Sequence, residues 1–221
     1  MLLTIAYNMA LAGVRVKYIT LEMDKIEVAE RILSRKSDVY STVAFRKTQS
    51  PPKYLVDKIN DAKQFFRENG NLSVLSVPRI SLSRLRAEIA SIGYGNTADV
   101  VIVDYLQLIS GRGRTESSAD FYDNTAQTLA EMAKTHGYAV VTAVQLNREG
   151  AVRGGDGLLM ACDCAFEIET DTYNGTDGSL EVTGSMRMVV SRYTPMMDVG
   201  AKETPAYDLI GRGQYWEERK K

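Results

Sequence analysis

The sequence predicts an α/β fold in which a mostly parallel sheet is flanked by helices. Apolar, β-branched runs at residues 100–103 and 138–144 are typical of strands that are covered on both faces. Amphipathic segments alternate with these runs, and strand–helix alternation favours a parallel sheet. After residue 165 the pattern changes to short β-rich runs, which predict short antiparallel strands near the C-terminus.

Five segments carry the apolar spacing of three and four residues that predicts a helix buried along one face. The first ends at Gly13, the third follows a Pro-Pro pair, and Ser81 or Ser83 suits the cap of the fourth. The last ends near His136, whose partial positive charge suits the C-terminal end of a helix dipole. The predicted helices are residues 1–12, 23–35, 53–69, 85–92 and 125–135.

Alternating and β-branched runs predict the strands that lie between and after these helices. A polar, glycine-containing stretch at residues 111–120 is typical of a loop, and residues 170–184 are rich in turn-forming residues. The predicted strands are residues 14–21, 72–77, 100–103 and 138–144, followed by the shorter 165–168, 187–190 and 207–210.

The composition is that of one globular domain. The chain has 221 residues, of which 44% are hydrophobic and 25% charged, and these proportions exclude disordered and fibrous classes. The 27 Lys and Arg against 28 Asp and Glu give a net charge of -1, so the charge of the whole chain indicates no nucleic-acid or membrane partner. Any binding of that kind would come from local loops.

The two cysteines, Cys162 and Cys164, are interpreted as small apolar residues of a buried segment. A disulfide across so short a loop would be strained, and no histidine cluster accompanies them to form a zinc site. This cysteine usage predicts a cytoplasmic protein. No apolar stretch reaches the about 18 residues that span a bilayer, so no membrane partner is expected.

Polar side chains follow three of the predicted parallel strands at the point where each strand ends. They are Glu22, Asp104 and Gln145. Open parallel sheets place their active groups at this edge. Asp104 follows four apolar residues, which is the form of a Walker B carboxylate that holds Mg²⁺. A nearby Glu could orient a water and a Gln could sense a phosphate, although a solvated or capping carboxylate is the alternative for each acid taken alone.

Four longer strings occur in order along the chain: Thr20-Leu-Glu-Met23, Val100-Val-Ile-Val-Asp-Tyr-Leu-Gln-Leu-Ile109, Ala139-Val-Val-Thr-Ala-Val-Gln-Leu-Asn-Arg148 and Val189-Val-Ser-Arg192. Together they resemble the C-terminal, RecA-like ATPase domain of DnaB-type replicative helicases, over nearly the whole chain. The resemblance implies a RecA-like sandwich and a single helicase motor domain over residues 1–221. That domain would begin just after the family's phosphate-binding loop.

The resemblance also implies a role for each polar residue and the cofactors ATP and Mg²⁺. Glu22 would polarise the water that attacks the γ-phosphate, and Asp104 would hold Mg²⁺ through water. Gln145 would report the nucleotide state to the loop that follows it. Arg192 would act as an arginine finger in the ATP site of a neighbouring subunit, although Val190 stands where the family usually has a Lys.

The family forms six-membered rings that thread single-stranded DNA. The candidate DNA-binding residues here are Arg112 and Arg114 in the 111–120 loop, and Arg148 and Arg153 in the segment after Gln145. Repeated around a ring, a few arginines form a basic channel that the net charge of one chain does not reveal. Simple solvation is the alternative for each of them. A helicase loader or a primase is a further implied partner, in the cytoplasm of a bacterial or phage-infected cell.

The sequence departs from the family at the phosphate site, because it contains no G-x-x-x-x-G-K-[ST]. Without that loop we expect the chain to bind ATP poorly. Three explanations are open: a fragment of a larger helicase, a degenerate homologue kept as a non-catalytic ring, assembly or DNA-binding module, and a recombinase-type RecA-like ATPase. The fragment is favoured because Glu22, Asp104 and Gln145 all persist.

Overall fold

The computed structural model describes residues 1–38, 52–95, 97–147, 157–174, 180–193, 207–212 and 215–218. The chain divides into two compact units, Met1–Ala161 and Cys162–Lys221, and each contains its own four-stranded sheet. The expectation that residues 1–221 act as a single motor domain stays a prediction.

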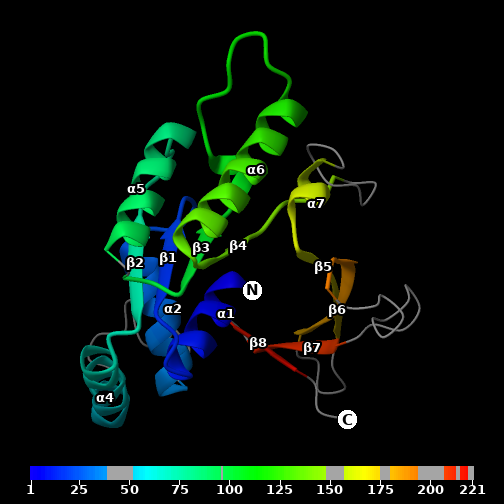
Figure 1. The fold of residues 1–221 in the computed structure, drawn as a ribbon. Helices are drawn as coiled ribbons and strands as arrows, with labels where there is room; N and C mark the ends of the chain where they lie inside the picture. Colours follow the sequence, from blue (N-terminus) through cyan, green and yellow to red (C-terminus); the bar gives the residue numbers. More distant parts are fainter. Residues whose placement is uncertain are drawn as a thin grey trace. The chain divides into compact units, whose positions relative to one another are not determined.

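The first unit is a parallel sheet with the strand order β2-β1-β3-β4, flanked by helices (Figure 1). This arrangement confirms the predicted α/β class. Its strands are β1 (Val16–Thr20), β2 (Leu72–Ser76), β3 (Val100–Asp104) and β4 (Ala139–Thr142). Its helices are α1 (Leu2–Leu11), α2 (Lys25–Ser37), α4 (Lys53–Glu68), α5 (Leu82–Tyr94), α6 (Ser118–His136) and α7 (Gly157–Ala161), with a short 3-10 helix, η1, at Leu106–Leu108.

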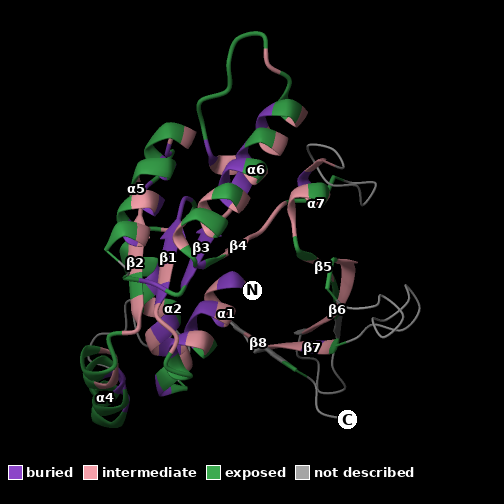
Figure 2. Cartoon of the chain, viewed as in Figure 1, coloured by how far each residue is buried: buried purple, intermediate pink, exposed green. Residues whose placement is uncertain are grey.

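The alternation of side chains along β1 and β3 builds a separate core on each face of this sheet. Tyr18 and Ile102 pack with α1 and α2 on one face. Ile19 and Val101 pack with α5 and α6 on the other. All four side chains are fully buried, and Figure 2 shows these central strands as the buried middle of the unit. The two central strands therefore have the apolar, doubly covered character that the sequence predicts.

Strand β4 differs from the prediction, which made it a strand buried on both faces. It pairs with β3, and within the described residues no strand pairs with its other edge. Val140, Val141 and Thr142 are in consequence only half-buried. An edge strand receives cover from one neighbour only, so its apolar run does not guarantee burial.

Capping residues set the helix ends that bear on the site. Asp24 accepts hydrogen bonds from the backbone N–H groups of Ile26 (2.7 Å) and Glu27 (2.8 Å), so α2 begins at Lys25 rather than at residue 23. Ser117 accepts from the N–H of Asp120 (3.0 Å), so α6 begins before the predicted residue 125 and takes in the end of the predicted loop. At its other end, α6 stops as predicted at His136.

The second unit is an antiparallel sheet of β5 (Cys164–Asn174), β6 (Leu180–Ser191), β7 (Tyr207–Arg212) and β8 (Tyr215–Glu218). The prediction of a turn-rich stretch at 170–184 is wrong, because most of it belongs to the β5–β6 hairpin. Acidic and hydroxyl side chains on one face of this hairpin obscure its alternation in the sequence. Strand β8 was not predicted.

Two smaller expectations concern the cysteines and the membrane. Neither Cys162 nor Cys164 forms a disulfide, but Cys162 is half-buried and Cys164 is exposed, so the interpretation as a buried pair is wrong. Among the helices of the described ranges, none is long and apolar enough to cross a membrane.

Candidate functional site

The carboxyl ends of β1 and β3 lie side by side, because Thr20 is in register with Asp104. The buried hydroxyl of Thr20 accepts a hydrogen bond from the N–H of Met23 (2.9 Å) and donates to its carbonyl (3.2 Å). The N–H of Leu21 donates to the carbonyl of Asp104 (2.8 Å). These bonds close a tight turn after β1. The exposed side chain of Glu22 therefore projects from a turn that is held at both ends.

Asp104 is the last residue of β3 and is half-buried. Its Oδ2 accepts a short hydrogen bond from the hydroxyl of Tyr18, which is fully buried on β1. Burial first, and then the charge of Asp104, raise the pKa of Tyr18, so the phenol remains a protonated donor. The peptide bond from Asp104 to Tyr105 is cis. The hydrogen bond from Tyr18 holds one carboxylate oxygen of Asp104, which leaves the other oxygen for a ligand.

Gln145 lies just beyond β4, and the side chain of Gln107 ties its backbone to the end of β3. The Gln107 Nε2 donates to the Gln145 carbonyl (3.3 Å), and the Gln145 N–H donates to the Gln107 Oε1 (3.2 Å). This pair of bonds imitates one more step of the β3–β4 ladder and leaves the Gln145 side chain exposed. Gln107 is a residue that reasoning from the sequence missed. Its position three residues after Asp104 was the available signal.

The loop between η1 and α6 presents one of its two arginines freely. Glu116 closes a turn on Gly113: its N–H donates to the Gly113 carbonyl (3.3 Å), and its Oε2 accepts from the Gly113 N–H (3.0 Å). Arg114 therefore lies at the tip of the turn, exposed, and no residue in the described ranges pairs with its side chain. Arg112 instead makes a short hydrogen bond to the hydroxyl of Ser118. Figure 1 shows this loop projecting away from the sheet.

The remaining predicted site residues are not gathered at this edge by the described structure. Arg148 and Arg153 lie outside the described residues. Arg192 lies in the second unit, where its Nη1 is 3.7 Å from Asp163 Oδ1 and its N–H donates to the Asp163 carbonyl (2.9 Å). The structure therefore brings together Glu22, Asp104 and the backbone of Gln145, and leaves the arginine finger untested.

The donor set at the edge fits a magnesium ion held by one carboxylate, with water and substrate oxygens completing its ligands. Within the described ranges, no group of three His, Cys, Asp or Glu could form an all-protein metal site. The phosphate side fits less well, because no glycine-rich loop with a Lys is present in the sequence to bind a triphosphate.

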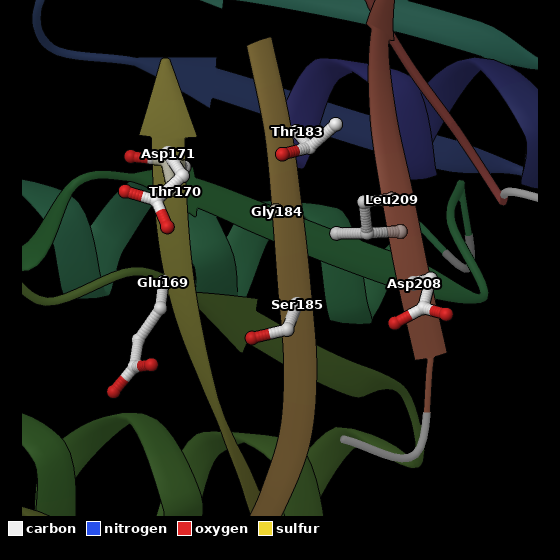
Figure 3. Close-up of a pocket in the computed structure, with 8 residues that line it drawn as sticks. All are labelled: Glu169, Thr170, Asp171, Thr183, Gly184, Ser185, Asp208 and Leu209. Atoms are coloured by element: carbon white, nitrogen blue, oxygen red, sulfur yellow. The ribbon is translucent and has the colours of Figure 1, made fainter. Parts of the chain in front are cut away.

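A polar cavity of about 490 Å³ lies on the sheet of the second unit, and none of the predicted site residues lines it. Figure 3 shows that the side chains of Glu169, Asp171, Ser185 and Asp208 contribute to its lining. Arg187 pairs with Glu167 and lies 3.7 Å from Glu169, which partly neutralises the acidic lining. This cavity carries no catalytic arrangement.

Comparison with known proteins bears on the parallel-sheet unit above all. The family model described as "DnaB-like helicase C terminal domain" matches residues 1–156. The replicative DNA helicase DnaB of Rickettsia prowazekii is 26% identical over 158 residues, which are 66% of this chain and 31% of that protein. DnaB of Mycoplasma pneumoniae is 25% identical over 133 residues, which are 59% of this chain and 27% of that protein. The chain thus spans about a third of the length of these curated relatives.

Solved structures show the same fold at low sequence identity. A DnaB-like replicative helicase, described with its interactions with primase, superposes with a TM-score of 0.77 and 18% identity, covering 94% of this chain and 51% of that one. A second solved structure, described as an ATPase domain, superposes with a TM-score of 0.75 and 18% identity, covering 99% of this chain and 79% of that one. These findings confirm the RecA-like fold and the resemblance drawn from the four sequence strings. The chain belongs to the DnaB-like helicase C-terminal domain family.

Proposed function

We propose that this chain is the motor domain of a hexameric, ATP-dependent replicative DNA helicase that unwinds duplex DNA by translocating on one strand. The observation that carries the proposal is the grouping of Glu22, Asp104 and the backbone of Gln145 at one edge of the parallel sheet, within the range that matches the family. Hydrolysis of ATP needs a positioned water and a magnesium ligand, and coupling it to movement needs a group that responds to the phosphate.

Each residue of the edge has a proposed task. When bound, ATP would supply the transferable phosphoryl group, and Mg²⁺ would supply the positive charge that neutralises the phosphate oxygens. Asp104, held by Tyr18, offers its second oxygen to the hydration shell of the ion. Glu22 accepts a proton from the attacking water and is exposed for this purpose. Gln145 transmits the state of the site to the segment that follows. Its backbone is fixed to the end of β3 by Gln107, and its side chain is left exposed.

The proposed ring adds the arginines. Arg114, with Arg112, Arg148 and Arg153, would contact the backbone of single-stranded DNA. Arg192 would reach the nucleotide of a neighbouring subunit, and for this its side chain would leave Asp163. A primase or helicase loader as partner, and a cytoplasmic location, belong to the same proposal.

Nucleotide binding is the step at which the proposal is tested. Because the 221 residues contain no phosphate-binding loop, we expect a fluorescent ATP analogue to bind this chain weakly. A second protein that also carries the residues encoded upstream should bind it at least about 100-fold more tightly, as a cradle of backbone N–H groups would add several hydrogen bonds to charged oxygens.

Failure of both proteins to bind the analogue would contradict the motor-domain proposal. That outcome would favour the second candidate, a non-catalytic RecA-like ring, assembly or DNA-binding module, which the missing loop motif itself supports. A recombinase-type ATPase has no comparable support, since the matching family is one of DnaB-like helicases and both named relatives are replicative helicases.

A further inference from the structure

Arg79 has a backbone conformation that arginine rarely adopts. Its φ is +61°, in the left-handed region that glycine and asparagine favour. The residue lies just after β2, at the same carboxyl edge of the sheet as Glu22 and Asp104. A non-glycine residue persists in this region only when its surroundings impose the conformation, and such residues cluster at functional sites.

Two buried neighbours impose the conformation. Val77 is buried, and its N–H donates to the carbonyl of Thr20 on β1 (3.0 Å). Ile80 is fully buried, and its carbonyl accepts from the N–H (2.8 Å) and the hydroxyl (3.1 Å) of Ser110. Both ends of the short segment are therefore fixed, and Pro78 and Arg79 are exposed between them.

The side chain of Arg79 has no polar partner among the described residues. It is exposed, and within the described ranges no hydrogen bond or ion pair reaches its guanidinium group. Arg84, close by in the sequence, pairs instead with Glu88 at 3.9 Å. Arg79 thus combines an unfavourable φ with an exposed guanidinium group that is available to a ligand.

The segment of Arg79 is joined to the loop that carries Arg112 and Arg114. Ser81 forms a parallel β-bridge with Ser110, and the N–H of Leu82 donates to the Ser110 carbonyl (3.0 Å). Arg79 and Arg112 each lie two residues from this bridge, so their Cα atoms are at most roughly 20 Å apart. One bound strand of a few nucleotides is long enough to reach both.

We propose that Arg79 binds a backbone phosphate of the single-stranded DNA that Arg112 and Arg114 contact. The inference rests on the proposed function and adds to it a residue for which the sequence offered no signal. Arginine presents a planar fork of donors that matches phosphate oxygens. DNA is favoured over the nucleotide as the source of the phosphate. Arg79 follows β2, which β1 separates from β3 and Asp104, whereas its backbone links to the 111–120 loop.

The test is fluorescence anisotropy of a labelled 20-mer of thymidylate, titrated with the full chain at several salt concentrations. Arg79→Gly removes the charge and suits the positive φ. We expect binding to weaken roughly 3- to 10-fold, the slope of log K against log salt to fall by about 0.7, and the unfolding midpoint to be no lower than that of the parent chain. Arg79→Lys should keep most of the slope. Arg67→Gln, an exposed arginine on α4, is the matched control and should change neither quantity.

The results that would contradict the inference separate the role of Arg79 from the proposed function. If the parent chain does not bind the oligonucleotide, the DNA contact in the proposed function fails, and this inference fails with it. If the parent binds and Arg79→Gly binds with the same slope, only the role of Arg79 is refuted. A lower unfolding midpoint in Arg79→Gly, an equal loss in Arg67→Gln, or weaker binding of fluorescent ADP with unchanged DNA binding would each overturn it as well.

Discussion

At the residue scale, the site depends on side chains that act through a neighbour rather than on the substrate. Tyr18 fixes one oxygen of Asp104, and Gln107 fixes the backbone of Gln145. Both partners come from strands or turns that are distant in sequence, so the contact exists only after β1, β3 and β4 have paired in register. These two contacts fix Asp104 and the backbone of Gln145 at defined points of the edge.

Tyr18→Phe tests the cost of losing such a bond. The variant keeps the aromatic packing and removes the donor from a half-buried carboxylate, so the free energy of unfolding should fall by about 0.5–1.5 kcal/mol. Chemical denaturation of the parent and the variant measures the difference. Tyr54→Phe is the control, because that hydroxyl belongs to a side chain that is 63% exposed on α4. Equal stabilities for the two variants would show that the bond to Asp104 contributes nothing.

At the scale of elements, the central strands and most helices could be predicted because their signals are local. The apolar run of β3 and the alternating run of β1 both become buried strands. The failures arise where the deciding factor is not local. The apolar run of β4 resembles that of β3, but its burial depends on a neighbour at each edge. The β5–β6 hairpin carries polar residues on one face, so its strands look like turns until they pair.

The candidate site divides in the same way. The positions of Glu22, Asp104 and Gln145 follow from the rule that parallel strands end at one edge, and the structure places all three there. Tyr18 and Arg79 could not be found, since the first depends on a contact between residues 86 apart in the sequence and the second on a backbone dihedral angle. Neither a long-range contact nor a local strain leaves a pattern in the composition or periodicity of one sequence.

The first residue of α7 lies against a side chain of α6. A side chain at Gly157, the first residue of α7, would overlap the carboxylate of Asp123 on α6, whose Oδ1 is buried and has no hydrogen-bond partner in the described structure. Gly157→Ala should therefore lower the free energy of unfolding by about 1–3 kcal/mol, although Gly→Ala normally favours a helix.

A double-mutant cycle checks this explanation. Asp123→Ala removes the obstructing carboxylate, so Gly157→Ala should cost at least about 0.5 kcal/mol less in that background. Gly70→Ala is the control, because a Cβ there meets nothing within 4 Å. Strict additivity of the two substitutions would mean that the Asp123 carboxylate does not cause the loss of stability in Gly157→Ala.

At the scale of the whole molecule, catalysis would belong to the proposed assembly, and the assembly would strengthen the DNA contacts that each chain makes. The net charge of -1 says little about DNA, because a ring repeats the arginines of each subunit around one channel. The phosphate cradle is absent from the sequence, and the proposed arginine finger serves a neighbour. In the proposed assembly, the edge with Glu22 and Asp104 would supply one part of a composite site, and its contribution would be measurable only where the other parts are present.

Glu22→Gln isolates that contribution in a protein that carries the phosphate loop and assembles. Glutamine keeps the size of the side chain but cannot accept a proton from water, so ATP turnover should fall by at least about 100-fold while nucleotide affinity stays within about twofold. Steady-state hydrolysis and binding of a fluorescent analogue measure the two quantities separately. Glu131→Gln, an exposed acid on α6, should leave both unchanged. Turnover at the parent rate in Glu22→Gln would remove Glu22 from the chemistry, and a parallel loss of binding would assign it to holding the nucleotide instead.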